Sequence, residues 1–133
     1  MHITTRTEYS VRALVELCFS QTALSLKVLS KEHKLPFKYL EQLFKELKEH
    51  GIVYSKAGAK GGYRLKKPAE KITLYDIVNA VERVPKVHNC LQGTDFEYCL
   101  GESCRFTTVW GRIGDHVEEY YKTITLAGII EEV

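Results

Sequence analysis

The sequence lacks any apolar run approaching the ~18 residues that a transmembrane helix requires. Residues 1–8 also lack the apolar stretch that forms the centre of a secretory signal peptide. We therefore expect a cytoplasmic protein. In that reducing compartment, its four cysteines are expected to be free, metal-binding or redox-active rather than joined in disulfides.

Sequence signs of catalysis are missing as well. The five histidines show no paired ligand spacing, and no nucleophile–base motif is visible. A net charge of +2 on 133 residues is too small to identify a partner. A nucleic-acid binder of this size is recognised by local basic clusters instead. A binding protein is therefore favoured over an enzyme, and the clusters have to be sought along the chain.

Helical periodicity dominates the first half of the sequence. Thr4 or Thr5 can cap a helix over residues 6–20, because a hydroxyl can accept from the free amides of the first turn. The apolar residues of this helix recur at helical spacing. Ser25 can cap a second helix that runs to about His33. Two short helices in this order are typical of the beginning of a helix-turn-helix domain.

A third helix is predicted between Pro36 and Gly51. Pro36 suits a first helical turn, and Gly51 can adopt the left-handed conformation that ends a helix. One face of this helix is apolar, and the other is polar and basic. A polar third helix after a tight turn matches the recognition helix of a helix-turn-helix domain. Taken alone, such a face is more often merely solvated.

A hairpin with a glycine-rich tip follows the third helix. Residues 52–56 form a strand-like run, residues 57–62 a turn, and residues 63–65 the returning strand. The tip lacks the Gly-Lys-Ser/Thr ending of a phosphate-binding loop, and by itself it could belong to any hairpin. Directly after a recognition helix it is a wing, whose basic tip suits phosphate or minor-groove contact. The predicted DNA-binding residues are Lys38, Tyr39, Glu41, Gln42, Lys45, Lys56, Lys60, Gly61, Gly62 and Tyr63.

Three of the four cysteines lie in an aperiodic loop in the second half. A helix capped by Thr73 and closed by Pro85 precedes this loop, which contains Cys90, Cys99 and Cys104. Thiolates gathered on one polar loop suit soft metals or redox chemistry, but no Cys-x-x-Cys pair indicates a zinc ribbon. Spacing alone therefore leaves the kind of metal or redox site open. Cys18 differs, because it lies on an apolar stripe and is expected to be a small core residue.

A long amphipathic helix is predicted from about residue 106 to residue 124. Its apolar stripe is longer and more aromatic than a small head, the predicted winged helix-turn-helix domain, can cover. We interpret the stripe as a homodimer interface, although an ordinary core helix folded back on the head is the alternative. The expected fold is mainly α, a winged helix-turn-helix with a long C-terminal dimerisation helix. The expected divisions are a DNA-binding domain at 1–84, a cysteine loop at 85–104, and the dimerisation helix with a C-terminal segment at 105–133.

Motifs along nearly the whole chain resemble the Rrf-type winged-helix regulators, the family that includes IscR, NsrR and RirA. The matching segments are residues 3–5, 8–9, 11–14, 39–43, 61–65, 72–77, 80–82, the three-cysteine loop, Val109-Trp110 and residues 124–126. The resemblance implies a homodimeric transcriptional repressor or activator whose cysteine loop holds an iron–sulfur cluster near the partner subunit's DNA-binding head. Loss of the cluster, or its reaction with nitric oxide or oxygen, would then change DNA affinity.

The resemblance also implies a set of cluster ligands. IscR-like members place a histidine three residues after the last cysteine, where this chain has Thr107. NsrR-like members use a carboxylate in the first helix of the partner, and Glu8 occupies that position. The expected metal ligands are Cys90, Cys99, Cys104 and, in trans, Glu8, on a four-iron rather than a two-iron cluster. His88 is the reserve ligand and would be preferred for zinc, while Glu8 could instead simply favour the start of its helix.

Two further points follow from the resemblance. Many members carry an arginine just before the first wing glycine, where this chain has Ala57, so Lys56 and Lys60 are expected to supply the basic contacts of the wing, to phosphates rather than in the minor groove. A cluster on a loop near solvent is expected to be lost to oxygen during aerobic purification. The alternative to a cluster sensor is a cluster-free regulator that uses its loop cysteines as thiol redox sensors or as a zinc site.

Overall fold

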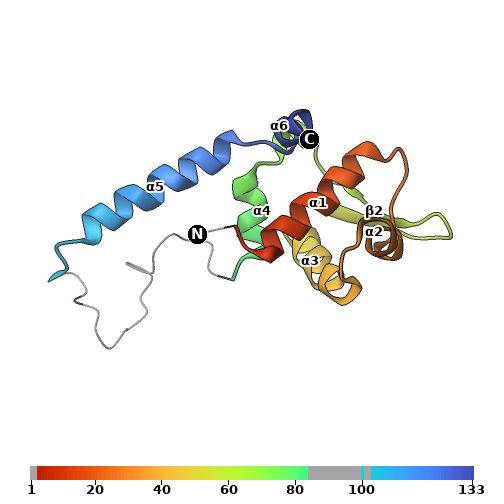
Figure 1. Cartoon of the computed structure of the whole chain (residues 1–133), viewed down its shortest axis with the longest axis horizontal. Helices are drawn as coiled ribbons and strands as arrows, with labels where there is room; N and C mark the ends of the chain where they lie inside the picture. Colours follow the sequence, from red (N-terminus) through yellow and green to blue (C-terminus); the bar gives the residue numbers. More distant parts are fainter. Residues whose placement is uncertain (1–2, 84–99, 101–102) are drawn as a thin grey trace.

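A computed structural model describes residues 3–83, 100 and 103–133 of the chain (Figure 1). Within these residues the polypeptide is mostly helical and contains a two-stranded antiparallel hairpin. The elements are α1 (Thr5–Phe19), α2 (Leu26–His33), α3 (Phe37–Glu49), β1 (Val53–Lys56), β2 (Gly62–Leu65), the 3-10 helix η1 (Ala69–Lys71), α4 (Leu74–Val81), α5 (Thr107–Thr123) and α6 (Leu126–Glu132). None of the helices in the described ranges is long and apolar enough to span a bilayer.

Hydroxyl side chains begin the helices where the sequence predicts them. Thr4, rather than Thr5, caps α1 by accepting from the amide of Arg6 at 3.1 Å. Ser25 caps α2 in the same manner. Thr73 forms a reciprocal capping box with Asp76 at the start of α4. Each hydroxyl satisfies an amide that has no partner within its own helix, so these local signals are sufficient to set the helix starts.

The ends of α3 follow the prediction with a shift of one residue. Pro36 is the N-cap of α3 rather than its first helical residue. At the other end, Gly51 has a φ of 70°, the left-handed conformation expected of a residue just beyond a helix. The α3 bounds therefore differ from the expectation only at the first turn.

The hydrophobic core lies between α3 and the helices α1, α2 and α4 that pack around it. Leu40, Leu43, Phe44 and Leu47 of α3 are completely buried. Their spacing of three and four residues places them on one side of the helix, which leaves the opposite side exposed. The core is completed chiefly by Ala13, Leu14, Leu29, Leu35, Ile52, Val53, Ile72, Ile77, Val81 and Leu126.

The hairpin of β1 and β2 is held against the connection between α1 and α2. Leu24 and Tyr63 form an isolated antiparallel bridge, which adds a third extended segment beside β2. A Cβ atom on Gly62 would lie 2.3 Å from the backbone carbonyl of Leu24, and the φ of Gly62 is +144°. Only glycine fits this position without strain, so the wing is attached closely to the helical head.

The helix α5 projects from the head with its first residues farthest away, and the chain runs back along it to α6, which lies on the head (Figure 1). The amide of Leu74 donates to the carbonyl of Ile124 at 2.8 Å, and the amide of Leu126 donates to that of Ile72 at 2.8 Å. Leu126 is completely buried in the core of the head. The C-terminal segment therefore contains a seven-residue helix that the sequence analysis did not predict.

Candidate DNA interface and sensor residues

The outer face of α3 carries the polar residues predicted to contact DNA. Lys38, Glu41, Gln42 and Lys45 are all exposed. They lie three or four residues apart and therefore share one face of the helix, opposite the buried leucines. This face can donate from ammonium and amide groups, as the major groove and its phosphates require.

Tyr39, another predicted contact residue, has partners within the head. Its ring packs edge-on against that of Tyr9, with 5.6 Å between the centroids and an interplanar angle of 88°. The guanidinium of Arg6 lies 5.8 Å from the centroid of Tyr39. The half-buried Tyr39 ring therefore fixes α3 against α1.

The wing presents two lysines and a backbone turn. Lys56 and Lys60 are exposed. A Cβ on Gly61 would lie 2.3 Å from the carbonyl oxygen of Lys56, so this glycine allows the tight turn at the tip. Tyr63 packs against Phe44 of α3, with 4.8 Å between ring centroids. The predicted wing residues thus divide into two exposed cations and three residues that shape the hairpin and attach it.

A charged network near α3 was missed by the sequence analysis. Arg6 of α1 forms an ion pair with Glu46, and Gln42 donates from Nε2 to Oε1 of Glu46 at 2.8 Å. The spacing of Gln42 and Glu46 is a local signal for this hydrogen bond. No sequence pattern connects Arg6 with a residue 40 positions away, because the packing of α1 against α3 brings the two together.

Cys104 is the one predicted cluster cysteine within the described residues, and it lies just before α5. Hydrogen bonds with the backbone of Phe106 and the side chain of Thr107 lower the pKa of its half-buried thiol. A lowered pKa favours the thiolate, which is the form that binds metals and reacts with oxidants. Cys90, Cys99 and His88 lie outside the described residues.

Glu8 is exposed in the first turn of α1. Figure 1 shows the beginnings of α1 and α5 well apart within one chain. Among the described residues, no group of three potential ligands gathers around a common point. The expectation that Glu8 acts from a partner subunit is compatible with this separation.

Cys18 has a different environment from Cys104. It lies half-buried on α1 and packs against the core. Burial, and to a smaller extent the Glu70 carboxylate, raise the pKa of the Cys18 thiol. Its sequence interpretation as a small apolar residue agrees with this location.

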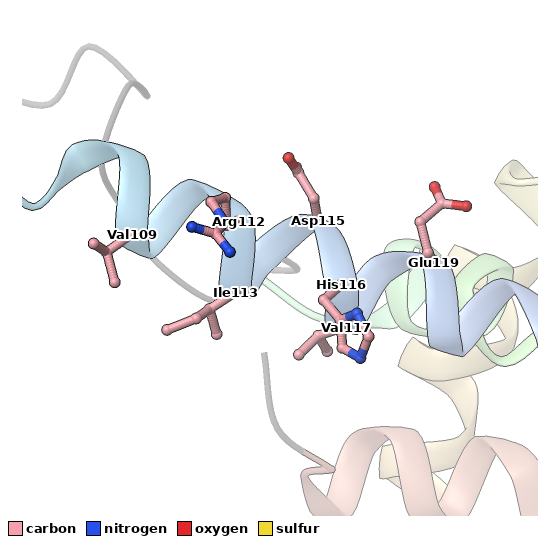
Figure 2. A pocket seen from close by; sticks show the side chains of 7 residues that line it. All are labelled: Val109, Arg112, Ile113, Asp115, His116, Val117 and Glu119. Carbon is pink, nitrogen blue, oxygen red and sulfur yellow. The ribbon is translucent and has the colours of Figure 1, made fainter.

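Apolar side chains are exposed along much of α5. Phe106 is 60% exposed, Trp110 44% and Ile113 44%. Figure 2 shows Val109, Ile113 and Val117 pointing to the same side of the helix, along a shallow hollow of about 650 Å³. Every residue that lines this hollow belongs to α5. Large apolar groups in this number rarely remain exposed on a monomer.

Comparison with known proteins gives the family context of this winged head. A family model described as Rrf2, an iron-dependent transcriptional regulator, matches residues 3–132. The chain belongs to the Rrf2 family. A helix-turn-helix transcriptional regulator from Neisseria meningitidis serogroup A is 32% identical, with 99% of this chain and 89% of the relative covered. IscR from Pectobacterium carotovorum is 30% identical, with 98% and 79% covered.

Solved structures of Rrf2-type regulators have the same fold. CymR, described as the global cysteine regulator of Bacillus subtilis, matches with a TM-score of 0.77 at 28% identity, covering 100% of this chain and 98% of CymR. IscR from T. potens matches with a TM-score of 0.73 at 28% identity, covering 99% and 88%. The predicted winged-helix fold and family are thus confirmed. This Rrf2 protein is a transcriptional regulator and not an enzyme.

Proposed function

We propose that this regulator binds operator DNA as a homodimer and that an iron–sulfur cluster on its cysteine loop controls the affinity for DNA. The observation that carries the DNA contact is the exposed row of Lys38, Gln42 and Lys45 on α3, which is followed by the exposed wing lysines. The cations would neutralise phosphates, while Gln42 would contact base edges. We place this activity in the cytoplasm.

Tyr39, Glu41, Gly61, Gly62 and Tyr63 complete the proposed interface. Tyr39 and Tyr63 support it through their contacts with Tyr9 and Phe44, and the two glycines shape the wing. Any DNA contact by these two tyrosines and two glycines would come in addition to their structural roles. Glu41 is exposed beside Gln42 and can accept from a cytosine amino group.

The homodimer is proposed from the exposed apolar side of α5. Burial of Trp110, Ile113 and their neighbours by a second α5 would remove apolar area from water, at roughly 25 cal/mol per Å². A two-fold arrangement would bring the same stripe of both subunits together and set the spacing of the two α3 helices on DNA. A second copy of the chain is therefore the occupant that this face favours.

The proposed ligands of the cluster are Cys90, Cys99, Cys104 and Glu8 of the partner subunit. Thiolates are the ligands that iron–sulfur clusters require, and the lowered pKa of Cys104 fits that chemistry. Exposed Glu8 is free of the core and accessible to a partner. When bound, a four-iron cluster would supply a group sensitive to oxygen, nitric oxide or iron supply, and Cys104 would connect that group directly to the start of α5.

A second candidate function is sensing by the cysteine thiols themselves, without a cluster. The lowered pKa of Cys104 supports it, because thiolates are also the form that oxidants attack. The structural similarity to a cysteine regulator is a further reason to keep this candidate. A zinc site with His88 as an additional ligand is the third form that the loop chemistry allows.

Purification without oxygen, followed by an absorption spectrum and counts of iron and acid-labile sulfide, tests the cluster proposal. We expect a brown protein with matched iron and sulfide in the wild type and in Cys18→Ala, and loss of both in Cys104→Ala. DNA affinity should change when the cluster is removed. A colourless wild type after anaerobic reconstitution would contradict the cluster and favour the thiol or zinc candidates, while leaving DNA binding intact.

A further inference from the structure

Arg6 connects three helices of the head. Its Nη2 atom pairs with the carboxylate of Glu46 on α3, and its Nε atom donates to the carbonyl oxygen of Val81 at the end of α4. The side chains of Arg6 and Glu46 are only 15% and 22% exposed. An ion pair that is largely shielded from water and bonded on two sides holds its members in one arrangement.

Glu46 uses its other carboxylate oxygen to hold Gln42. Oε1 of Glu46 accepts from Nε2 of Gln42 at 2.8 Å. A carboxylate can only accept, so the nitrogen of the Gln42 amide has to face Glu46. The amide oxygen and the second N–H of Gln42 then remain available on the exposed face of α3.

We propose that Arg6 and Glu46 are positioning residues for base recognition, which fix the order in which Gln42 presents its donor and acceptor to DNA. This inference rests on the proposed contact between α3 and the major groove. Adenine offers an acceptor at N7 and a donor at N6, and a glutamine amide held in one orientation pairs with both. The partner of Gln42 is therefore one adenine of the operator.

Arg6 has a second effect on the same surface. A carboxylate on the DNA-facing helix would repel phosphates if its charge were not compensated. The guanidinium of Arg6 supplies the compensating charge from the protein side. Glu46 can thus orient Gln42 without weakening the attraction of α3 for DNA.

The test begins with selection of an operator by the full-length wild type from a library of randomised duplexes. Affinities are then measured for that operator and for all its single-base variants. We expect wild type to prefer adenine at one position by about tenfold or more. Gln42→Ala and Glu46→Ala should each remove most of this preference, while other positions keep theirs.

Three variants distinguish the proposed positioning role of Glu46 from the effects that its removal has on folding and on the charge of α3. Glu46→Gln keeps the size of the side chain but has one acceptor oxygen for two donors, Arg6 and Gln42, so it should lose most of the preference. Glu49→Ala removes the same charge from an exposed site on α3 and should change affinity without changing base preference. Glu46→Met fills the space of Glu46 without an acceptor, so it repeats the test if Glu46→Ala unfolds. Thermal unfolding of each variant identifies any that have lost the fold.

The outcomes distinguish this inference from the proposed function. The double variant Gln42→Ala/Glu46→Ala should be no less selective than Gln42→Ala, because the two residues act on one contact. Normal adenine preference in folded Glu46→Ala and Glu46→Met would overturn the positioning role while leaving Gln42 as a reader. Failure of wild type to select any duplex would overturn DNA recognition and the positioning role together.

Discussion

Leu24 and Tyr63 exchange two backbone hydrogen bonds, one of 3.1 Å from Leu24 and one of 2.7 Å from Tyr63. Together with the contact between Tyr63 and Phe44, this pairing attaches the wing both to the α1–α2 connection and to α3. The position of the wing is therefore determined where β2 follows the turn, and residues 57–60 of the turn are left exposed to reach a ligand.

Gly62→Ala tests this attachment. The added Cβ would clash with the Leu24 backbone at a φ that L-residues disfavour, so we expect a loss of about 1–3 kcal/mol in the free energy of unfolding. DNA affinity should fall as well. Gly111→Ala is the control, because nothing beyond its chain neighbours and the nearby backbone of its own helix lies within 4 Å of the new Cβ, and the helix should gain up to about 1 kcal/mol. Urea unfolding measures both, and equal stabilities for the two variants would contradict the close approach at Leu24.

Lys60→Ala tests the wing as a phosphate contact. We expect weaker binding to all duplexes and a reduction of about 0.9 per subunit, or roughly 1.8 for the proposed dimer, in the slope of log affinity against log salt concentration. Lys122→Ala removes the same charge from α5, where Lys122 is paired with Glu119, and should leave the slope unchanged. Identical slopes for the wild type and Lys60→Ala would exclude a phosphate contact at the wing tip.

Ile113→Asp tests the α5 dimer. A carboxylate in the middle of the apolar stripe would have to be desolvated in the interface, so we expect monomers in analytical ultracentrifugation and much weaker operator binding. Thr108→Asp places the same charge at an exposed polar position of α5 and should remain dimeric. A dimer of unchanged stability in Ile113→Asp would show that α5 is covered in another manner or not at all.

The two described cysteines should differ in their reaction with iodoacetamide in metal-free protein. The pKa of Cys104 is lowered, so its thiolate forms at lower pH and alkylation should accelerate below the usual range for a thiol. The pKa of Cys18 is raised, so its alkylation should need higher pH and proceed slowly. Mass spectrometry of the two peptides across a pH series gives both profiles. Coinciding profiles would contradict the assigned environments.

Local signals in the sequence were sufficient for most of the fold. Capping hydroxyls at Thr4, Ser25 and Thr73 set helix starts through contacts within three residues, and Gly51 ends α3 by its own conformation. The α6 helix was missed although Thr125 caps it, because a short helix is stable only through packing. Here that packing is the burial of Leu126 in a core formed by distant residues.

The site was less accessible to sequence reasoning than the fold. Lys38 and Lys45 were identified by charge and helical spacing, and Lys60 by its place in the glycine-rich turn of the hairpin; all three are exposed. The inward packing of Tyr39 and Tyr63 could not be predicted, because an aromatic residue beside a polar face can turn either way. The pairing of Arg6 with Glu46 depends on how α1 crosses α3, which no local pattern records.

The junction at Ile124 has a mechanical consequence for α5. Backbone hydrogen bonds fix the helix to the head at this end, while Cys104 lies just beyond the opposite end. Seventeen helical residues span about 25 Å at roughly 1.5 Å per residue, so a tilt of about 10° at the junction would displace the far end by about 4 Å. A slight rotation of α5 at Ile124 is therefore enough to accommodate a displacement at its Cys104 end.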